Sequence, residues 1–259
     1  MFAGVAYGQV IQAPYERILL PIALSPPIAG AHGSQWASEL VIRNESDEGL
    51  VISTTPYAGT IAAFALYPPH STFGYGYDFV RNPNGGEFLY VGSPGIGKVT
   101  FNLRVHDISR DTSTFGTTIP VVREKNVYTG KLQLINIPIS SDFRSALRVF
   151  DFDSNTKVPR VVRLRIYDMC GAGPFDRDCS DTPLVDTTVS LPNGGEESYT
   201  NPDHPGFAMI GDLATAFPQL AGQSRVRIDL DPVTADLRFW AFVSTTHNET
   251  QEVTVITPN

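Results

Sequence analysis

Apolar and polar residues alternate strictly over several stretches of this chain, and this pattern limits the fold more than any other feature. From 98 to 106 every even position is polar, and every odd position between them is apolar. The stretches 161–167 and 225–231 show the same period of two. Such a period marks strands with one face buried and the other in water. The 22 glycines and 20 prolines are scattered, which favours short strands joined by turns over long helices.

Parts of the sequence recur in the same order, which indicates an internal repeat. Residues 36–44 match residues 143–151 at an offset of 107, and residues 105–120 match 243–258 at an offset of 138. Pro-Asn-Gly-Gly-Glu occurs at 83–87 and again at 192–196. The growing offset places about 30 extra residues in the second half, around 207–220. There Asp212 is a suitable N-cap for one short helix.

These observations predict an all-β chain of two tandem, related antiparallel β-sandwich units, immunoglobulin-like or jelly-roll-like, with at most one short helix in the second. The expected division is 15–116 for the first sandwich and 117–259 for the second. No Gly/Ser-rich linker separates them, so we expect the units to pack together. Residues 1–14 form an N-terminal segment, interpreted either as the remnant of a signal peptide or as a strand for exchange.

Two stretches carry a resemblance: 33–44, with the pattern Gly-Ser-Gln-Trp-x-Ser-x-Leu-x-Ile-x-Asn, and 241–258, near the end of the chain. Together they resemble uncharacterised β-sandwich modules found repeated in large secreted bacterial proteins. The resemblance covers most of 15–259 and rests on loose motifs. It implies the fold and a place outside the cell, and it carries no activity to this chain.

The two cysteines and the charge of the chain bear on its location and partners. Cys170 and Cys179 are separated by eight residues that include Gly171, Gly173 and Pro174, so we expect a disulfide closing a loop in an oxidising compartment. The net charge is −8 without clustered Lys or Arg, which argues against nucleic acid as a partner. No apolar run reaches the roughly 18 residues of a membrane span.

Residues 92–98 fit G-x-x-x-x-G-K, the opening of a phosphate-binding loop. That loop requires Ser or Thr next, to hold magnesium, and then a helix. Val99 follows instead, and the chain continues with the alternation of a strand. We therefore predict a glycine-rich hairpin loop and no nucleotide binding, and no cofactor is expected apart from calcium.

Two groups of acidic residues are candidates for calcium. Residues 151–155 fit D-x-D-x-N, but Thr156 stands where glycine is expected, and no Glu follows at the twelfth position. A hairpin turn is the alternative interpretation. The second group lies near the cysteines. The candidate calcium ligands are Asp151, Asp153, Asn155, Asp176 and Asp178.

Aromatic residues gather between 57 and 90, and Tyr75, Tyr77 and Phe79 alternate so as to share one face of a strand. Exposed, this row would stack on sugar rings or form a protein interface; buried, it would belong to the core. All three interpretations stay open at this stage.

The function expected from the sequence is that of a secreted, non-catalytic structural, assembly or adhesion protein at the cell surface or outside the cell. Its partners would be other protein chains, with self-assembly through sandwich edges or through the apolar strand at 18–22. The alternatives are a carbohydrate-binding module that uses the aromatics of 57–90, and a polysaccharide hydrolase with a carboxylate pair that sequence cannot locate.

Overall fold

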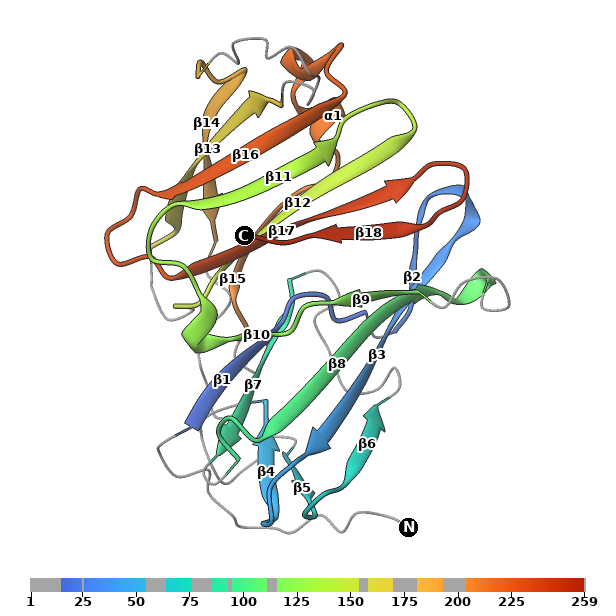
Figure 1. Ribbon diagram of the computed structural model, residues 1–259, viewed down its shortest axis with the longest axis vertical. Coiled ribbons are helices and arrows are strands. Elements are labelled where there is room, and N and C mark those ends of the chain that lie inside the picture. Colours follow the sequence, from blue (N-terminus) through green and yellow to red (C-terminus); the bar gives the residue numbers. More distant parts are fainter. Residues whose placement is uncertain are drawn as a thin grey trace, which may run out of the picture. The chain divides into compact units, whose positions relative to one another are not determined.

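The computed structural model describes residues 15–24, 26–54, 64–75, 85–92, 95–110, 116–153, 158–169, 181–192 and 204–258. Within them, antiparallel strands form four sheets in an all-β, sandwich-like fold, as the sequence predicts (Figure 1). The one α-helix in the described part is α1 (Leu213–Ala216). Four 3-10 turns accompany it: η1 (Ala31–Gly33), η2 (Ile108–Arg110), η3 (Glu124–Asn126) and η4 (Pro218–Leu220).

The chain divides into two compact units, with the change from the first to the second between Val127 and Tyr128; His204 and Pro205 group with the first. In the first unit, one sheet has the order β10-β1-β7-β4-β5, and the other has β2-β3-β8-β9 with β6 also paired to β3. The strands are β1 (Tyr15–Leu20), β2 (Ile28–Ala29), β3 (Gln35–Asn44), β4 (Leu50–Ser53), β5 (Phe64–Tyr67), β6 (Thr72–Tyr75), β7 (Glu87–Gly92), β8 (Val99–Asp107), β9 (Thr117–Ile119) and β10 (Val122–Arg123).

The second unit contains two four-stranded sheets, β11-β16-β13-β14 and β15-β12-β17-β18. The strands are β11 (Leu132–Pro138), β12 (Phe143–Asp151), β13 (Arg160–Asp168), β14 (Val185–Leu191), β15 (Gly206–Ile210), β16 (Arg225–Pro232), β17 (Phe239–His247) and β18 (Val253–Ile256). One hydrophobic core draws side chains from both sheets, among them Leu134, Leu164 and Ile228 from the first and Val149 and Ala241 from the second.

The predicted strands of period two are present at β8, β13 and β16. In β13, Val162, Leu164 and Ile166 are fully buried, while Arg163 between them is exposed. The alternation works because successive side chains of a strand point to opposite faces, and only one face of this sheet meets the core.

The β12–β17 pair departs from simple alternation, because both of its faces are covered. Val149 and Ala241 belong to the core of the unit, and Phe150, Trp240 and Phe242 on the opposite face are also buried. These three rings lie within 5.4–6.3 Å of one another, centroid to centroid. Strands buried on both faces carry continuous apolar runs, so alternation alone did not reveal this aromatic layer.

The N-terminal strand β1 lies inside a sheet. It pairs with β7 along its whole length and with β10 at Ile18 and Leu19. Ion pairs fasten the same contact: Arg123 Nη1 lies 2.6 Å from Glu16 Oε2, and Arg17 Nη2 lies 3.1 Å from Glu124 Oε1. Thus β1 pairs within the chain on both sides, whereas the sequence-based expectation was self-assembly through the apolar strand at 18–22. Residues 1–14 lie outside the described part.

Strands β9 and β10 pair with β8 and β1, so they are built into the first unit. The sequence-based division had assigned 117–259 to the second unit. Backbone pairing between distant segments decides where this boundary falls, and no change of composition near residue 117 signals it. In the second unit, the predicted short helix occurs as α1 with Asp212 at its N-cap position. The Asp212 carboxylate accepts a hydrogen bond from the Thr215 hydroxyl at 2.6 Å.

The strand orders of the two units correspond. Without β10, the first sheet of unit one is β1-β7-β4-β5, which matches β11-β16-β13-β14. When β2 is left out and β6, which also pairs with β3, is taken in its place, the other sheets match as β6-β3-β8-β9 and β15-β12-β17-β18. The pairing of β3 with β8 and of β12 with β17 runs over nine residue pairs in each case. Superposing these two registers gives an offset of 107 for β3, as in the sequence match, but 140 for β8, which is two residues away from the sequence match at 138.

The Pro-Asn-Gly-Gly-Glu pentapeptides do not take part in this correspondence. The first copy leads into β7, whereas the second follows β14. In the matching strand orders β7 corresponds to β16, and β14 corresponds to β5. The identical pentapeptides therefore adjoin strands that do not correspond, and their identity is no argument for a repeat.

Candidate functional site

The two carboxylates of the candidate calcium motif that the structure describes, Asp151 and Asp153, lie at the end of β12. Asp151 Oδ1 accepts a hydrogen bond from the Asp153 backbone at 2.9 Å. Asp153 Oδ2 accepts from Arg160 Nη1 at 2.7 Å, and Asp153 Oδ1 accepts from Arg238 Nε at 3.0 Å. Arg160 Nη1 also lies 3.6 Å from Asp151 Oδ1.

Two arginines therefore take the place that a cation would have beside these carboxylates. Partial burial by itself would raise the pKa of Asp153, but hydrogen bonds from Arg238 and Arg160 and their charges outweigh it and lower that pKa. The cluster ties the end of β12 to the beginning of β13 and to the segment that leads into β17. Asn155, Asp176 and Asp178 lie outside the described residues. Among those described, no three His, Cys, Asp or Glu side chains are grouped to hold a metal ion.

At the corresponding end of β3, Asn44 makes the same kind of turn. Its Oδ1 accepts from the Ser46 backbone at 2.8 Å, two residues ahead, as Asp151 accepts from Asp153. Its amide nitrogen donates to the carbonyls of Glu48, Tyr67 and Pro68 at 2.7–3.2 Å, and the residue is fully buried. Such side chains satisfy backbone groups that a strand end leaves unpaired.

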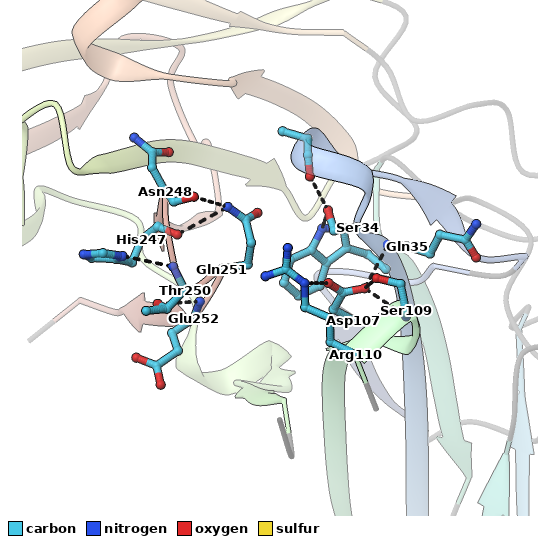
Figure 2. A network of polar contacts seen from close by, with 12 residues as sticks. Ser34, Gln35, Asp107, Ser109, Arg110, His247, Asn248, Thr250, Gln251 and Glu252 are labelled. Carbon is cyan, nitrogen blue, oxygen red and sulfur yellow. Dashed lines mark hydrogen bonds and ion pairs between the residues drawn. The ribbon is translucent and has the colours of Figure 1, made fainter. Parts of the chain in front are cut away.

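The far end of the central pair in the first unit is capped by Asp107, which closes β8 (Figure 2). Its Oδ1 accepts from the Ser109 backbone at 3.0 Å, from the Ser109 hydroxyl at 2.6 Å and from the Gln35 backbone at 2.9 Å. Burial would raise the pKa of Asp107, but these hydrogen bonds and the charge of Arg110 lower it overall. The carboxylate holds η2 and the start of β3 together.

His247 has the corresponding place at the end of β17 in the second unit, and Figure 2 shows its turn separately from that of Asp107. Its Nδ1 accepts from the backbone of Glu249 and Thr250, both at 3.3 Å. The Gln251 amide donates to the Asn248 carbonyl at 2.6 Å, which tightens the same turn. The sequence predicted no role for His247, because only its position at the end of a strand distinguishes it.

The phosphate-loop-like stretch ends in a turn that leads directly into strand β8, as predicted. Lys98 is exposed, and its backbone donates to the Gly95 carbonyl at 2.8 Å. The expectation of a hairpin is wrong, because β7 and β8 belong to different sheets and the turn joins them. A Cβ on Gly95 would lie 2.5 Å from Leu50 Cδ2, so close packing with β4 requires glycine at this position.

The remaining predicted site residues have no described geometry. Cys170, Cys179, Tyr77 and Phe79 lie outside the described residues, as does the side chain of Tyr75. Other aromatics of the 57–90 region are inside the first unit: Tyr67, Phe88 and Tyr90 are buried, and Tyr67 packs edge-on against Phe73 at 4.9 Å between centroids.

The second unit also has an edge strand, β14, for which the sequence predicted no particular residues. Strand β14 ends its sheet and pairs with β13 over seven consecutive positions without a register shift. In the described part of the chain it has no strand partner on its other side. Asp186, Thr187, Thr188 and Ser190 are exposed. An edge of this length presents unpaired backbone groups to which another strand can add.

The charged residue of β14, Asp186, is paired with an arginine on the neighbouring strand β13. Asp186 receives a two-point contact from Arg163 on β13, with Nε to Oδ1 at 2.8 Å and Nη2 to Oδ2 at 2.6 Å. These hydrogen bonds lower the pKa of Asp186, so the pair stays ionised at neutral pH. Arg165 and Asp231 form a further pair with Nη2 and Oδ2 2.5 Å apart on the same face of the sheet.

Comparison with known proteins gives no relative: no family model matches the chain, and neither a curated protein nor a solved structure matches it. No helix among the described residues is both long enough and apolar enough to cross a membrane.

Proposed function

We propose that this protein is a secreted, non-catalytic structural or adhesion protein that works by contact with other protein chains. The observation that carries the proposal is the open edge of β14. Strand β14 pairs over seven positions without a register shift and has no second strand partner among the described residues, and the inner face of its sheet packs into the core. Strand addition at such an edge supplies main-chain hydrogen bonds without any change in the fold of the receiving unit.

The use of the polar side chains supports the same function. Asn44, Asp107, Asp151 and His247 each accept a hydrogen bond from the backbone two residues ahead, at the ends of the central strands. Asp153 is held by two arginines. These groups are engaged in fixing turns, which is the work of a scaffold, and a rigid scaffold is what a contact surface needs.

We also propose that the two units are copies of one ancestral unit. The matching strand orders support this, and so do the caps: Asn44 and Asp151 stand at the offset of 107, and Asp107 and His247 at the offset of 140. A repeated module that presents sheet edges suits a protein built for assembly. The expected place of action outside the cell rests on the cysteine spacing.

Hydrogen–deuterium exchange resolved by segment tests the proposed function. We expect amides of β14 to become protected as protein contacts form at rising protein concentration, while β13 stays protected throughout. The same preparation should leave a panel of polysaccharides intact. Hydrolysis of one of these glycans, abolished by a single carboxylate substitution, would overturn the proposal in favour of the hydrolase alternative.

A further inference from the structure

We propose that two copies of this chain join through β14, edge to edge and antiparallel, about a two-fold axis at Thr188. This inference deepens the proposed function and rests on it, since it names the partner for the same edge. Joining the two edges would extend each four-stranded sheet into one sheet of eight strands running through both copies.

The first argument is that β14 lacks the features that keep strand edges from pairing. The strand at the other edge of the same sheet, β11, has a register shift between Leu134 and Ile137. It also has Asn136 in the left-handed region, with φ 64°, and a proline as its last residue. In the other sheet of this unit, the edge strands β15 and β18 have only five and four residues. Bulges, prolines and short length are the usual protections of an edge. Strand β14 has seven residues, no proline, no lysine and no bulge.

The second argument is the self-complementarity of the β14 sequence. In an antiparallel pair of strands, residues directly opposite each other point to the same face of the sheet. A two-fold axis between two copies of β14 must therefore lie at a residue, and that residue then faces its own copy. The axis at Thr188 is the one that pairs all seven residues. It places Asp186 opposite Ser190, which can donate a hydrogen bond to the carboxylate, and it brings no two like charges together.

The inner face of β14 fits the same register. Val185 and Leu191 are buried in the core of the unit, Val189 packs against it in part, and Thr187 between them is exposed. In the proposed pair, Val185 faces Leu191 and Thr187 faces Val189 of the second copy. In an antiparallel pair about this axis, the core-facing sides of both copies lie on the same face of the joined sheet.

The experiment uses the full chain and the charge at the axis. Thr188 faces itself across the axis, so Thr188→Lys and Thr188→Glu each place two like-charged side chains directly opposite each other, with their Cβ atoms about 5 Å apart. Both substitutions are at an exposed side chain, so the fold should be kept, which circular dichroism checks. Thr254→Lys is the matched control, since Thr254 is also an exposed threonine on an edge strand.

Sedimentation equilibrium should show wild type and Thr254→Lys passing from 28.3 kDa to twice that mass with rising concentration. We expect a weak dimer, with a dissociation constant on the order of 10 µM. Each Thr188 variant alone should bind itself about tenfold or more weakly, and an equimolar mixture of the two should dimerise again.

A wild type that stays at the mass of one chain overturns the inference. So does a dimer that both Thr188 variants leave unchanged, or one that the mixture fails to restore. A dimer formed through another surface, with the amides of β14 left unprotected, overturns this inference and the use of that edge but not action by protein contact, whereas glycan hydrolysis overturns the proposed function itself.

Discussion

Replacing Asn44 by alanine should destabilise the first unit more than any change at an exposed asparagine. Its side chain is fully buried: the two amide hydrogens are shared among three carbonyl oxygens, and the amide oxygen accepts hydrogen bonds from the backbone and the hydroxyl of Ser46. At about 0.5–1.5 kcal/mol each, these bonds bound the loss. Some of the backbone groups that lose Asn44 as a partner will form hydrogen bonds with water instead. We therefore expect the free energy of unfolding to fall by about 3–5 kcal/mol.

The two tryptophans make this measurable for one unit at a time, since Trp36 belongs to the first unit and Trp240 to the second. In a Trp240→Phe background, urea unfolding followed by fluorescence reports the first unit alone. Asn102→Ala is the control, because Asn102 is exposed on β8 and should change stability by less than about 0.5 kcal/mol.

Asn44→Asp sharpens the test. It keeps the size of the side chain but removes its donors and places a carboxylate against three carbonyl oxygens. We therefore expect it to cost at least as much as alanine at pH 7. A loss below about 1 kcal/mol for Asn44→Ala, or one no larger than that of Asn102→Ala, would refute the view that these side-chain caps hold the strand ends.

Three further predictions follow from individual contacts. The folded pKa of Asp153 is lowered from its ordinary 3.8, so its stabilisation is complete above pH 3.8 and is lost as the pH falls through the lowered value; Asp153→Asn should remove that part of the acid dependence of thermal unfolding. Gly95→Ala should cost about 1–3 kcal/mol in urea unfolding by overpacking, whereas Gly130→Ala, with open space around it, should be tolerated. Cys170 and Cys179 should resist alkylation under denaturing, non-reducing conditions, and an intact mass showing two alkylated thiols would disprove the disulfide.

Strands with one face in water could be predicted, because their alternation of polar and apolar residues is a local pattern. In β8, β13 and β16 each residue reveals its face by its own polarity, and the structure places these strands within a residue or two of the expected limits. The short helix was predictable for a similar reason, since Asp212 precedes a brief run of helix-forming residues. The role of the Asp151–Asp153 motif was not, because the arginine that joins Arg160 on Asp153 comes from position 238, far along the chain.

By itself, the sequence determined an all-β chain and the location of strands such as β8, β13 and β16, because polarity alternation and turn residues act between near neighbours. Tertiary structure alone decided that β9 and β10 belong to the first unit, that the 92–98 loop crosses between sheets, and that both faces of β12 and β17 are covered. It also decided that, among the described residues, β14 has a strand partner on one side only, while β1 has one on each side. Which strands become neighbours depends on pairing between segments distant in the chain, and that pairing leaves no mark on the local pattern of residues.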